Sequence, residues 1–211
     1  MTFSRSRAVR SALLATAVVV AVVAAPAAAA STTAEAGSGP RPLLGAVRDG
    51  APPTLLEVVA QRSRSGSSTP VECHDVKITS RANGKLVSAE LGYAGADYAM
   101  LRARADVQGP WEVFTVCLDR ANSTIRSKAN GKLVSAELGY AGADYAMLRA
   151  RADVEGPWER FSIDLSCDNQ CVTIRSSTNG KLVSAELGYA GADYAMLRAR
   201  ADVQGPWEEF R

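Results

Sequence analysis

Three features are scarce in this sequence: histidine, an excess of charge of one sign, and long apolar segments. The single histidine, His74, is not repeated and has no serine or cysteine nucleophile around it, which argues against a catalytic triad. The formal net charge of the 211 residues is +2, and basic and acidic side chains are mixed throughout. This mixture excludes the one-sign surface that nucleic-acid binding requires, and the charges are most simply interpreted as solvated faces.

The only apolar run that could enter a membrane lies near the N-terminus. Three arginines precede an apolar run over residues 12–25, and alanines at 28–30 offer a cleavage site. A spanning helix needs about 20 apolar residues, so we expect residues 1–30 to be a cleaved signal peptide rather than a permanent anchor. The mature chain is then expected to be secreted, extracellular and free of membrane attachment.

Residues 31–70 are rich in Ala, Ser, Thr, Gly and Pro and cannot bury enough apolar area to offset the entropy of ordering. We therefore expect a flexible, disordered linker. Within it, Thr54 and Glu57 form a capping-box pattern beside apolar residues, which predicts a short helix at about 55–62 that could dock on the folded part. Alone this helix would be marginal, because isolated helices shorter than about 12 residues rarely persist in water.

Internal repetition is the dominant feature of the rest of the chain. A block of 32 residues occurs three times without gaps, at 83–114, 130–161 and 179–210. Only two columns vary, and they contain Gln108, Glu155 and Gln204, and Val113, Arg160 and Glu209. A pitch of 47 and then 49 residues lies in the range of solenoids, propellers and closed threefold folds. Any binding site in one copy is therefore expected in triplicate.

Each repeat contains the pattern of four short strands. Alternating residues at 76–80 and 85–91 flank Asn83-Gly84, a dipeptide typical of type I′ hairpin turns, and strands at 100–104 and 111–118 follow. Twelve strands without a helical pattern predict an all-β fold, and closure of the sheet would remove exposed strand edges. We therefore expect one domain over residues 71–211, with repeats at about 71–119, 120–166 and 167–211.

The four cysteines favour disulfides over metal ligation, because an exported chain meets an oxidising compartment. Cys73 and Cys117 would face each other if the outer strands of the first repeat pair antiparallel, which makes this the first expected pairing. Cys167 and Cys171 would then close a small local loop. A four-cysteine zinc site is the alternative, although it would contain only one close pair of ligands where structural zinc sites usually have two.

Two sequence blocks occur together in every repeat. In the first copy they are Ile-x-Ser-x-x-Asn-Gly-Lys-x-Val-x-Ala-Glu at 78–90 and Arg-Ala-x-x-x-Gly-Pro-Trp-Glu-x-Phe at 104–114. Together they resemble the fascin-like β-trefoil repeat of the actin-cross-linking superfamily, in a secreted bacterial type. The resemblance covers 71–211 and implies a single β-trefoil of three near-identical four-stranded repeats. Leu86 stands where the family often carries an aromatic residue, and the strand around Phe210 is expected to be short or frayed.

The segment 91–99 of the first repeat combines two tyrosines and one aspartate among small residues. Proteins commonly hold a sugar by stacking its apolar face on an aromatic ring while its hydroxyls donate to a carboxylate. In the alternative interpretation, Tyr93 packs on the barrel and Asp97 stabilises a turn. The candidate ligand-binding residues of the three copies are Tyr93, Asp97, Tyr98, Tyr140, Asp144, Tyr145, Tyr189, Asp193 and Tyr194. Trp111, Trp158 and Trp207 are expected to seal the base of the barrel, and the alternative is an exposed stacking platform for sugar or ring ligands.

Triplication favours binding over catalysis, because three equal active sites on one small barrel would be unusual for an enzyme. We therefore expect a secreted, non-enzymatic and monomeric binding module without cofactor or metal, which recognises carbohydrate or another extracellular polymer. The family resemblance implies an alternative, an actin- or filament-binding protein of the fascin-like type. Bundling would then need a dimer or two repeat faces, since the chain has one trefoil. A third interpretation is an exported inhibitor or toxin-like accessory protein.

Overall fold

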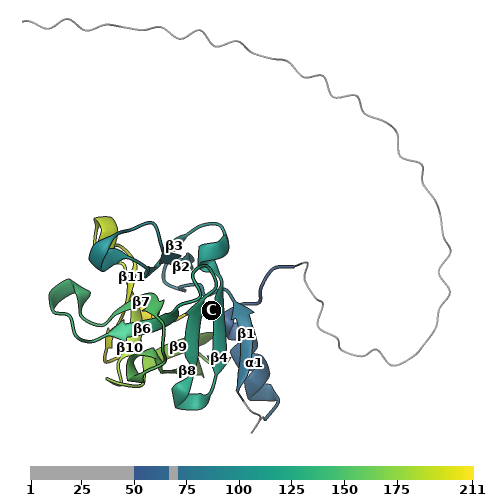
Figure 1. Cartoon of the computed structure of the whole chain (residues 1–211). Coiled ribbons are helices and arrows are strands. Elements are labelled where there is room, and N and C mark those ends of the chain that lie inside the picture. Colours follow the sequence, from purple (N-terminus) through teal and green to yellow (C-terminus); the bar gives the residue numbers. More distant parts are fainter. Residues whose placement is uncertain (1–49, 67–70) are drawn as a thin grey trace, which may run out of the picture. The chain divides into compact units, whose positions relative to one another are not determined.

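Eleven strands follow one helix in the part of the chain that the structure, a computed structural model, describes: residues 50–66 and 71–211 (Figure 1). The helix is α1 (Leu55–Arg64), and the strands are β1 (Glu72–Val76), β2 (Leu86–Glu90), β3 (Met100–Ala105), β4 (Phe114–Leu118), β5 (Thr124–Ser127), β6 (Leu133–Glu137), β7 (Met147–Ala152), β8 (Phe161–Ser166), β9 (Cys171–Ser176), β10 (Leu182–Glu186) and β11 (Met196–Ala201). The predicted signal peptide and most of the predicted linker lie outside the described residues. No described helix is long and apolar enough to cross a membrane.

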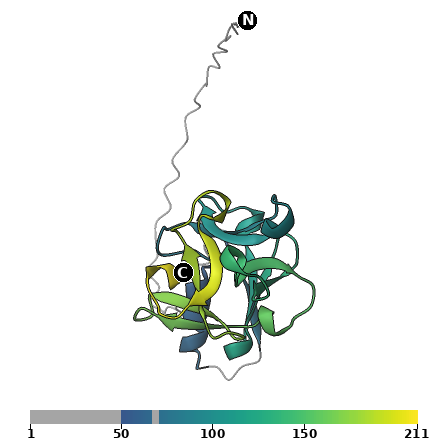
Figure 2. The same cartoon turned by 90° about the vertical axis from the view of Figure 1, so that its left-hand side faces the viewer.

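Three hairpins, β2–β3, β6–β7 and β10–β11, share one sequence and pair with one another through their second strands. We call these six strands the hairpin layer. Three equivalent hydrogen bonds join it, each from an alanine amide to an alanine carbonyl: Ala103 to Ala195 (2.8 Å), Ala150 to Ala99 (2.8 Å) and Ala199 to Ala146 (2.9 Å). Figure 2 shows the teal, green and yellow segments of the three repeats side by side. The ring of contacts closes the sheet around an approximate threefold axis, which confirms the predicted closed all-β fold.

The core is filled by the last residue of each repeated block. The rings of Phe114, Phe161 and Phe210 are fully buried, and inward-facing aliphatic residues such as Val87 and Leu101 of each repeat pack with them in one cluster. Burial of a phenylalanine side chain stabilises a fold by about 2–3 kcal/mol. Because the phenylalanine occupies the same column in every copy, the repeated sequence directly supplies a threefold core.

The predicted twelfth strand is present only as a short segment at the C-terminus. Phe210 forms isolated bridges with Ser80 and Val172 instead of a full strand. Its amide donates to Val172 O (3.0 Å), and the amide of Arg211 donates to Thr79 O (2.8 Å). The segment is therefore short, as expected, but it is bonded on both sides and is not frayed. It closes the barrel between the first and third repeats.

The hairpin turn before β2 differs from the predicted type I′ geometry. A type I′ turn needs positive φ at both central residues, whereas only Gly84 (φ 70°) has it in the Asn83-Gly84 pair. The amide of Gly84 donates to Ser80 O (2.9 Å), and the Asn83 side chain accepts from the Lys85 amide (3.0 Å) and donates to Ala103 O (2.8 Å). Asn83 therefore ties a longer turn to strand β3, and its role is structural.

Helix α1 begins at the capping box that the sequence contains. The Glu57 amide donates to Thr54 Oγ1 (3.2 Å), and the Thr54 amide donates to Glu57 Oε2 (2.8 Å). Leu55, Val58 and Val59 are buried, and the helix packs on β1, β8 and β9. The folded body therefore begins before residue 71, since an amphipathic helix inside the segment assigned to the linker gains its stability from this packing.

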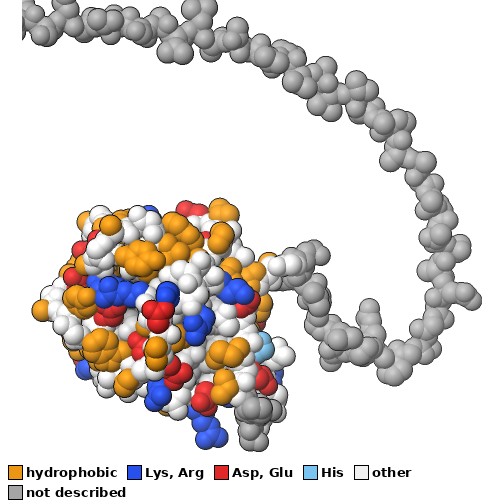
Figure 3. Space-filling view, viewed as in Figure 1, with side chains coloured by type: hydrophobic (Ala, Val, Ile, Leu, Met, Phe, Trp, Pro, Cys, Tyr) orange, Lys and Arg blue, Asp and Glu red, His pale blue; other side chains and the backbone are white. Residues whose placement is uncertain are grey.

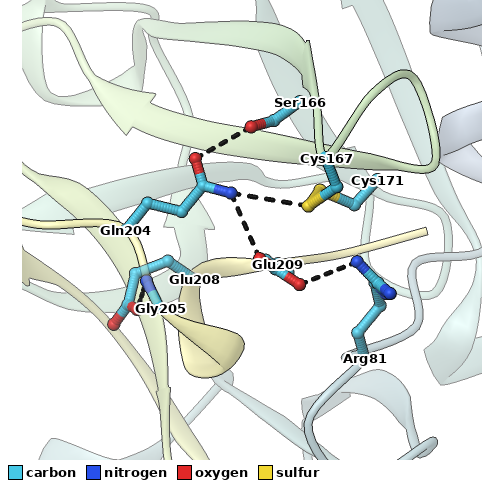
Figure 4. Close-up of a disulfide and its surroundings, with 8 residues drawn as sticks. All are labelled: Arg81, Ser166, Cys167, Cys171, Gln204, Gly205, Glu208 and Glu209. Atoms are coloured by element: carbon cyan, nitrogen blue, oxygen red, sulfur yellow. Dashed lines mark hydrogen bonds and ion pairs between the residues drawn. A yellow bond between two sulfur atoms is a disulfide. The ribbon is translucent and has the colours of Figure 1, made fainter.

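Both expected disulfides are present. Cys73 and Cys117 face each other in the antiparallel pair β1–β4 and are bonded, and Cys167 bonds Cys171 across the tight turn between β8 and β9 (Figure 4). No cysteine in the described residues is free, so the four-cysteine zinc site has no thiolates to bind a metal.

Candidate functional site

The candidate loops connect the two strands of each hairpin. In the first repeat the loop contains the short 3₁₀ turn Gly95–Asp97 and ends at Ala99, which has φ 59°. The equivalent alanines have φ 58° (Ala146) and 60° (Ala195). A left-handed conformation costs a residue with a Cβ roughly 1–2 kcal/mol, so the surrounding contacts must hold each loop in this shape.

The second tyrosine of every loop lies at the surface. Tyr98, Tyr145 and Tyr194 are 39%, 37% and 38% exposed, so the three copies present nearly equal rings to solvent. The aspartate before each ring is half-buried. Within the described residues no hydrogen bond or ion pair involves the side chain of Asp97 or Asp193, while Asp144 Oδ1 lies 3.9 Å from Arg149 Nη2. Each repeat thus has an exposed tyrosine directly after a half-buried aspartate in the sequence.

The other predicted tyrosine of each loop has a different role. Tyr93 and Tyr189 are half-buried, and their hydroxyls accept hydrogen bonds from Arg102 (3.0 Å) and Arg198 (3.1 Å). Tyr140 is 40% exposed, and its hydroxyl instead accepts from Arg151 Nη2 (2.9 Å). Tyr93 and Tyr189 therefore match the alternative in which this tyrosine packs on the protein body.

Arginines beneath the loops were missed by the sequence analysis. Arg102, Arg149 and Arg198 are at most 3% exposed, so their interpretation as part of a solvated face is wrong. Each lies two residues after a methionine of the buried cluster Met100, Met147 and Met196, so it shares the outward face of β3, β7 or β11 with that methionine. The only sequence signal was the spacing of two residues between methionine and arginine, which places both on one face of the strand, and the threefold pairing buries both.

A second arginine of each hairpin is locked by a buried glutamate. Arg200 donates from Nε and Nη2 to the two carboxylate oxygens of Glu186, both at 2.6 Å, and Glu186 is 1% exposed. Hydrogen bonding to Glu186 raises the pKa of Arg200 above its usual range, against the opposing effect of burial. The arrangement repeats at Arg104 with Glu90 and at Arg151 with Glu137. The pairs of the first and third repeats are charge-neutral, whereas Glu137 of the second also accepts from Arg149 (2.8 Å).

The tryptophans lie beside the loops rather than in the core. Trp111, Trp158 and Trp207 are 38–39% exposed, so the expectation that they seal the barrel is wrong; the buried phenylalanines fill the core instead. A Cβ placed on Gly92 would lie 3.4 Å from the Trp111 ring, which shows how closely the indole approaches the start of the loop. The sequence signal was the variable position two residues after each tryptophan, because the charged Arg160 and Glu209 at this position indicate a solvent-exposed face.

One face of the molecule has a surface of mixed chemical character. Figure 3 shows apolar, basic and acidic side chains intermingled on one face of the molecule, without a large area of one sign. Aromatic rings, a carboxylate and small residues are suited to a flat ligand with an apolar face and hydroxyl groups.

No protein-family model matches the sequence, and no curated protein matches it either. Solved structures do match the fold. The designed threefold-symmetric protein ThreeFoil has a TM-score of 0.55 at 16% identity, with 65% of this chain and 96% of that chain covered. A ricin B-like lectin from Macrolepiota procera, solved with lactose, has a TM-score of 0.51 at 16% identity, with coverage of 67% and 96%. A salivary protein from Culex has a TM-score of 0.52 at 16% identity, with coverage of 68% and 94%. These likenesses, together with the threefold hairpin layer, show that the fold is a β-trefoil.

Proposed function

We propose that this protein is an extracellular, non-enzymatic carbohydrate-binding module with three recognition sites, one in each hairpin loop. The observation that supports it most is the equal exposure of Tyr98, Tyr145 and Tyr194, each beside an aspartate. A pyranose ring would stack on the tyrosine while its hydroxyls donate to the carboxylate. The indole beside each loop would widen the apolar platform.

The triplication also supports a repetitive target. Single shallow sites of this kind bind weakly, but simultaneous engagement of several sites can raise avidity by a factor on the order of 10² to 10⁴. A polysaccharide presents the same sugar many times along its length, so it is the target class that gains from three equal sites.

The structural neighbours support the same class by analogy of fold. The lectin from Macrolepiota procera was solved with lactose on a β-trefoil. An extracellular location is supported by the two disulfides, because such bonds persist in oxidising compartments. The predicted signal peptide at 1–30 belongs to the same proposal.

A pull-down on insoluble polysaccharides followed by a glycan array tests the proposal. The protein should bind at least one polysaccharide, and the triple variant Tyr98→Ala/Tyr145→Ala/Tyr194→Ala should lose that signal. The matched control is the triple alanine variant of Val107, Val154 and Val203, which are 78–79% exposed on the same repeats. Silence of the unmodified protein in both assays would remove the proposal.

The fascin-like resemblance provides the competing result. If the protein binds filaments, it should co-sediment with actin, whereas a carbohydrate module should remain in the supernatant. Co-sedimentation together with silence on glycans would favour the filament function instead.

A further inference from the structure

The buried arginines of the hairpin layer reach across the boundaries between repeats. Arg102 belongs to the first repeat, but its Nε donates to Tyr194 O (2.8 Å) and its Nη2 to Gly191 O (3.0 Å), both in the third repeat. These two carbonyls bracket the 3₁₀ turn Gly191–Asp193. One guanidinium therefore holds both ends of the turn that presents Asp193 and Tyr194.

Arg198 makes the same contacts one repeat further on. It belongs to the third repeat, and it donates to Tyr145 O (2.9 Å) and Gly142 O (2.9 Å) in the second. Its remaining terminal nitrogen bonds the tyrosine hydroxyl of its own repeat, as that of Arg102 does. The cross-repeat contact is therefore a feature of the fold and not of one location.

Arg149 breaks the pattern. By symmetry it should hold Gly95 O and Tyr98 O of the first repeat, and the backbone register that would allow this is present, with Met100 opposite Arg149. Its Nη1 instead donates to Glu137 Oε2 (2.8 Å), and its guanidinium lies 4.8 Å from the Tyr140 ring centroid. Its Nε and Nη2 are buried without a hydrogen-bond partner among the described residues, and Nη2 lies 3.9 Å from Asp144 Oδ1 in its own repeat. The two donors that hold a loop carbonyl in Arg102 and Arg198 make no hydrogen bond to the first loop here.

We propose that Arg102 and Arg198 are positioning residues that pre-organise the recognition loops of the third and second repeats, while the loop of the first repeat is left unclamped. The functional meaning rests on the proposed carbohydrate sites. Each clamped site is then built from two repeats, and removing an arginine should damage the site of its neighbour rather than its own. Charge-assisted hydrogen bonds are the stronger class, so their loss should be measurable at the loop itself.

Hydrogen–deuterium exchange tests the clamp without any ligand. The three loops have identical peptides, so each must first be marked by mass with one exposed substitution per protein, Ala96→Ser, Ala143→Ser or Ala192→Ser. In these marked proteins, which keep all three arginines, the backbone amides of the first loop should exchange about tenfold faster than those of the second and third loops. This comparison needs no arginine variant and remains decisive if such variants fold poorly.

Arginine-to-lysine variants then give matched controls for one another. Arg102→Lys should accelerate exchange about tenfold in the third loop only, Arg198→Lys in the second loop only, and Arg149→Lys in none of the three. Equal exchange in all three unmodified loops, or acceleration of all loops by any one variant, would overturn the clamp.

A binding measurement connects the clamp to function. In Tyr98→Ala/Tyr145→Ala, which keeps only the third site, Arg102→Lys should weaken binding of the polysaccharide identified above, and Arg198→Lys should not. In Tyr98→Ala/Tyr194→Ala, which keeps only the second site, Arg198→Lys should weaken binding and Arg102→Lys should not. If no polysaccharide binds but the exchange pattern holds, the proposed function fails and the clamp stands. If binding occurs but both lysine variants act alike, the positioning role fails and the proposed function stands.

Discussion

The hairpin layer of the molecule is threefold repeated, whereas the helix side is not. We call α1, the strands it covers and the two disulfides the helix side. In the hairpin layer every buried residue occurs three times, from the methionine cluster to the glutamate–arginine pairs. On the helix side, α1 and each disulfide occur once, because the sequence there is not repeated. The repeated part offers equivalent surfaces, and the unrepeated part distinguishes one repeat from another.

The two variable columns of the repeat also contribute to this distinction. Their residues contact each other: Arg160 Nε donates to Glu155 Oε1 (2.9 Å), and Gln204 Nε2 donates to Glu209 Oε1 (3.2 Å). Two of them also reach another repeat: Glu209 accepts from Arg81 of the first repeat (2.8 Å), and Gln204 accepts from Ser166 of the second (2.8 Å) (Figure 4). Nearly identical repeats can mispair, and this ion pair favours the correct neighbours where the barrel closes.

The largest expected effect lies on the helix side. Cys73 and Cys117 are 44 positions apart, and Cys167 and Cys171 only 4. Chain entropy then gives about 4 kcal/mol of unfolding free energy for the long bridge and about 2 for the short one. Urea unfolding of Cys73→Ser/Cys117→Ser, with Cys167→Ser/Cys171→Ser as its control, measures the difference. Size-exclusion chromatography should also show more dimer in the former, since the order of the repeats is less constrained. Equal losses and an unchanged monomer would contradict this assignment.

Equivalent substitutions in the three hairpins of the hairpin layer should lower the unfolding free energy by equal amounts. Met100, Met147 and Met196 are each fully buried, so replacement by alanine should cost about 3 kcal/mol in each case. If the layer is truly threefold, the three losses of unfolding free energy should agree to within about 0.5 kcal/mol. Chemical denaturation of the three single variants provides the test. A spread of about 2 kcal/mol would show that the layer is not energetically symmetric.

The N-terminus of α1 should show a smaller, local effect. Thr54→Ala removes the side-chain oxygen that accepts from the Glu57 amide, and loss of an N-cap costs about 1 kcal/mol. Thr54→Ser keeps the oxygen and serves as control. Protease digestion should cut the Thr54→Ala protein faster within α1 while the hairpin layer stays intact. Equal cleavage of the two variants would mean that the capping box does not hold the helix.

The smallest expected effect is a dependence of the unfolding free energy on pH in the acidic range. Hydrogen bonding from Lys128, and then from Thr115, lowers the pKa of Asp75 below its usual 3.8. A lowered carboxyl pKa stabilises the fold above pH 3.8, and this contribution disappears as the pH falls through the folded value. Asp75 is nearly half exposed, so the effect should stay below about 1 kcal/mol. The stability difference between the unmodified protein and Asp75→Asn should therefore shrink from pH 6 to pH 2; a constant difference would contradict the assignment.

Local sequence rules predicted the parts of this molecule that depend on neighbours along the chain. Strand alternation placed Cys73 opposite Cys117, and the capping box marked the start of α1 at Leu55. The burial of Arg102 could not be predicted this way. An arginine on the outward face of a strand is expected to be solvated. Only the packing of the other two repeats against that face buries it. The exposure of Trp111 could not be predicted either. Phe114, three residues later, fills the core position that the indole was expected to occupy.

We propose three recognition sites on this barrel, one in each hairpin loop. Native mass spectrometry of the protein with an oligosaccharide from the bound polysaccharide tests this proposal most directly. We predict up to three ligands per chain, with one lost for each of Tyr98→Ala, Tyr145→Ala and Tyr194→Ala. A single bound ligand that persists whichever tyrosine is removed would contradict the account.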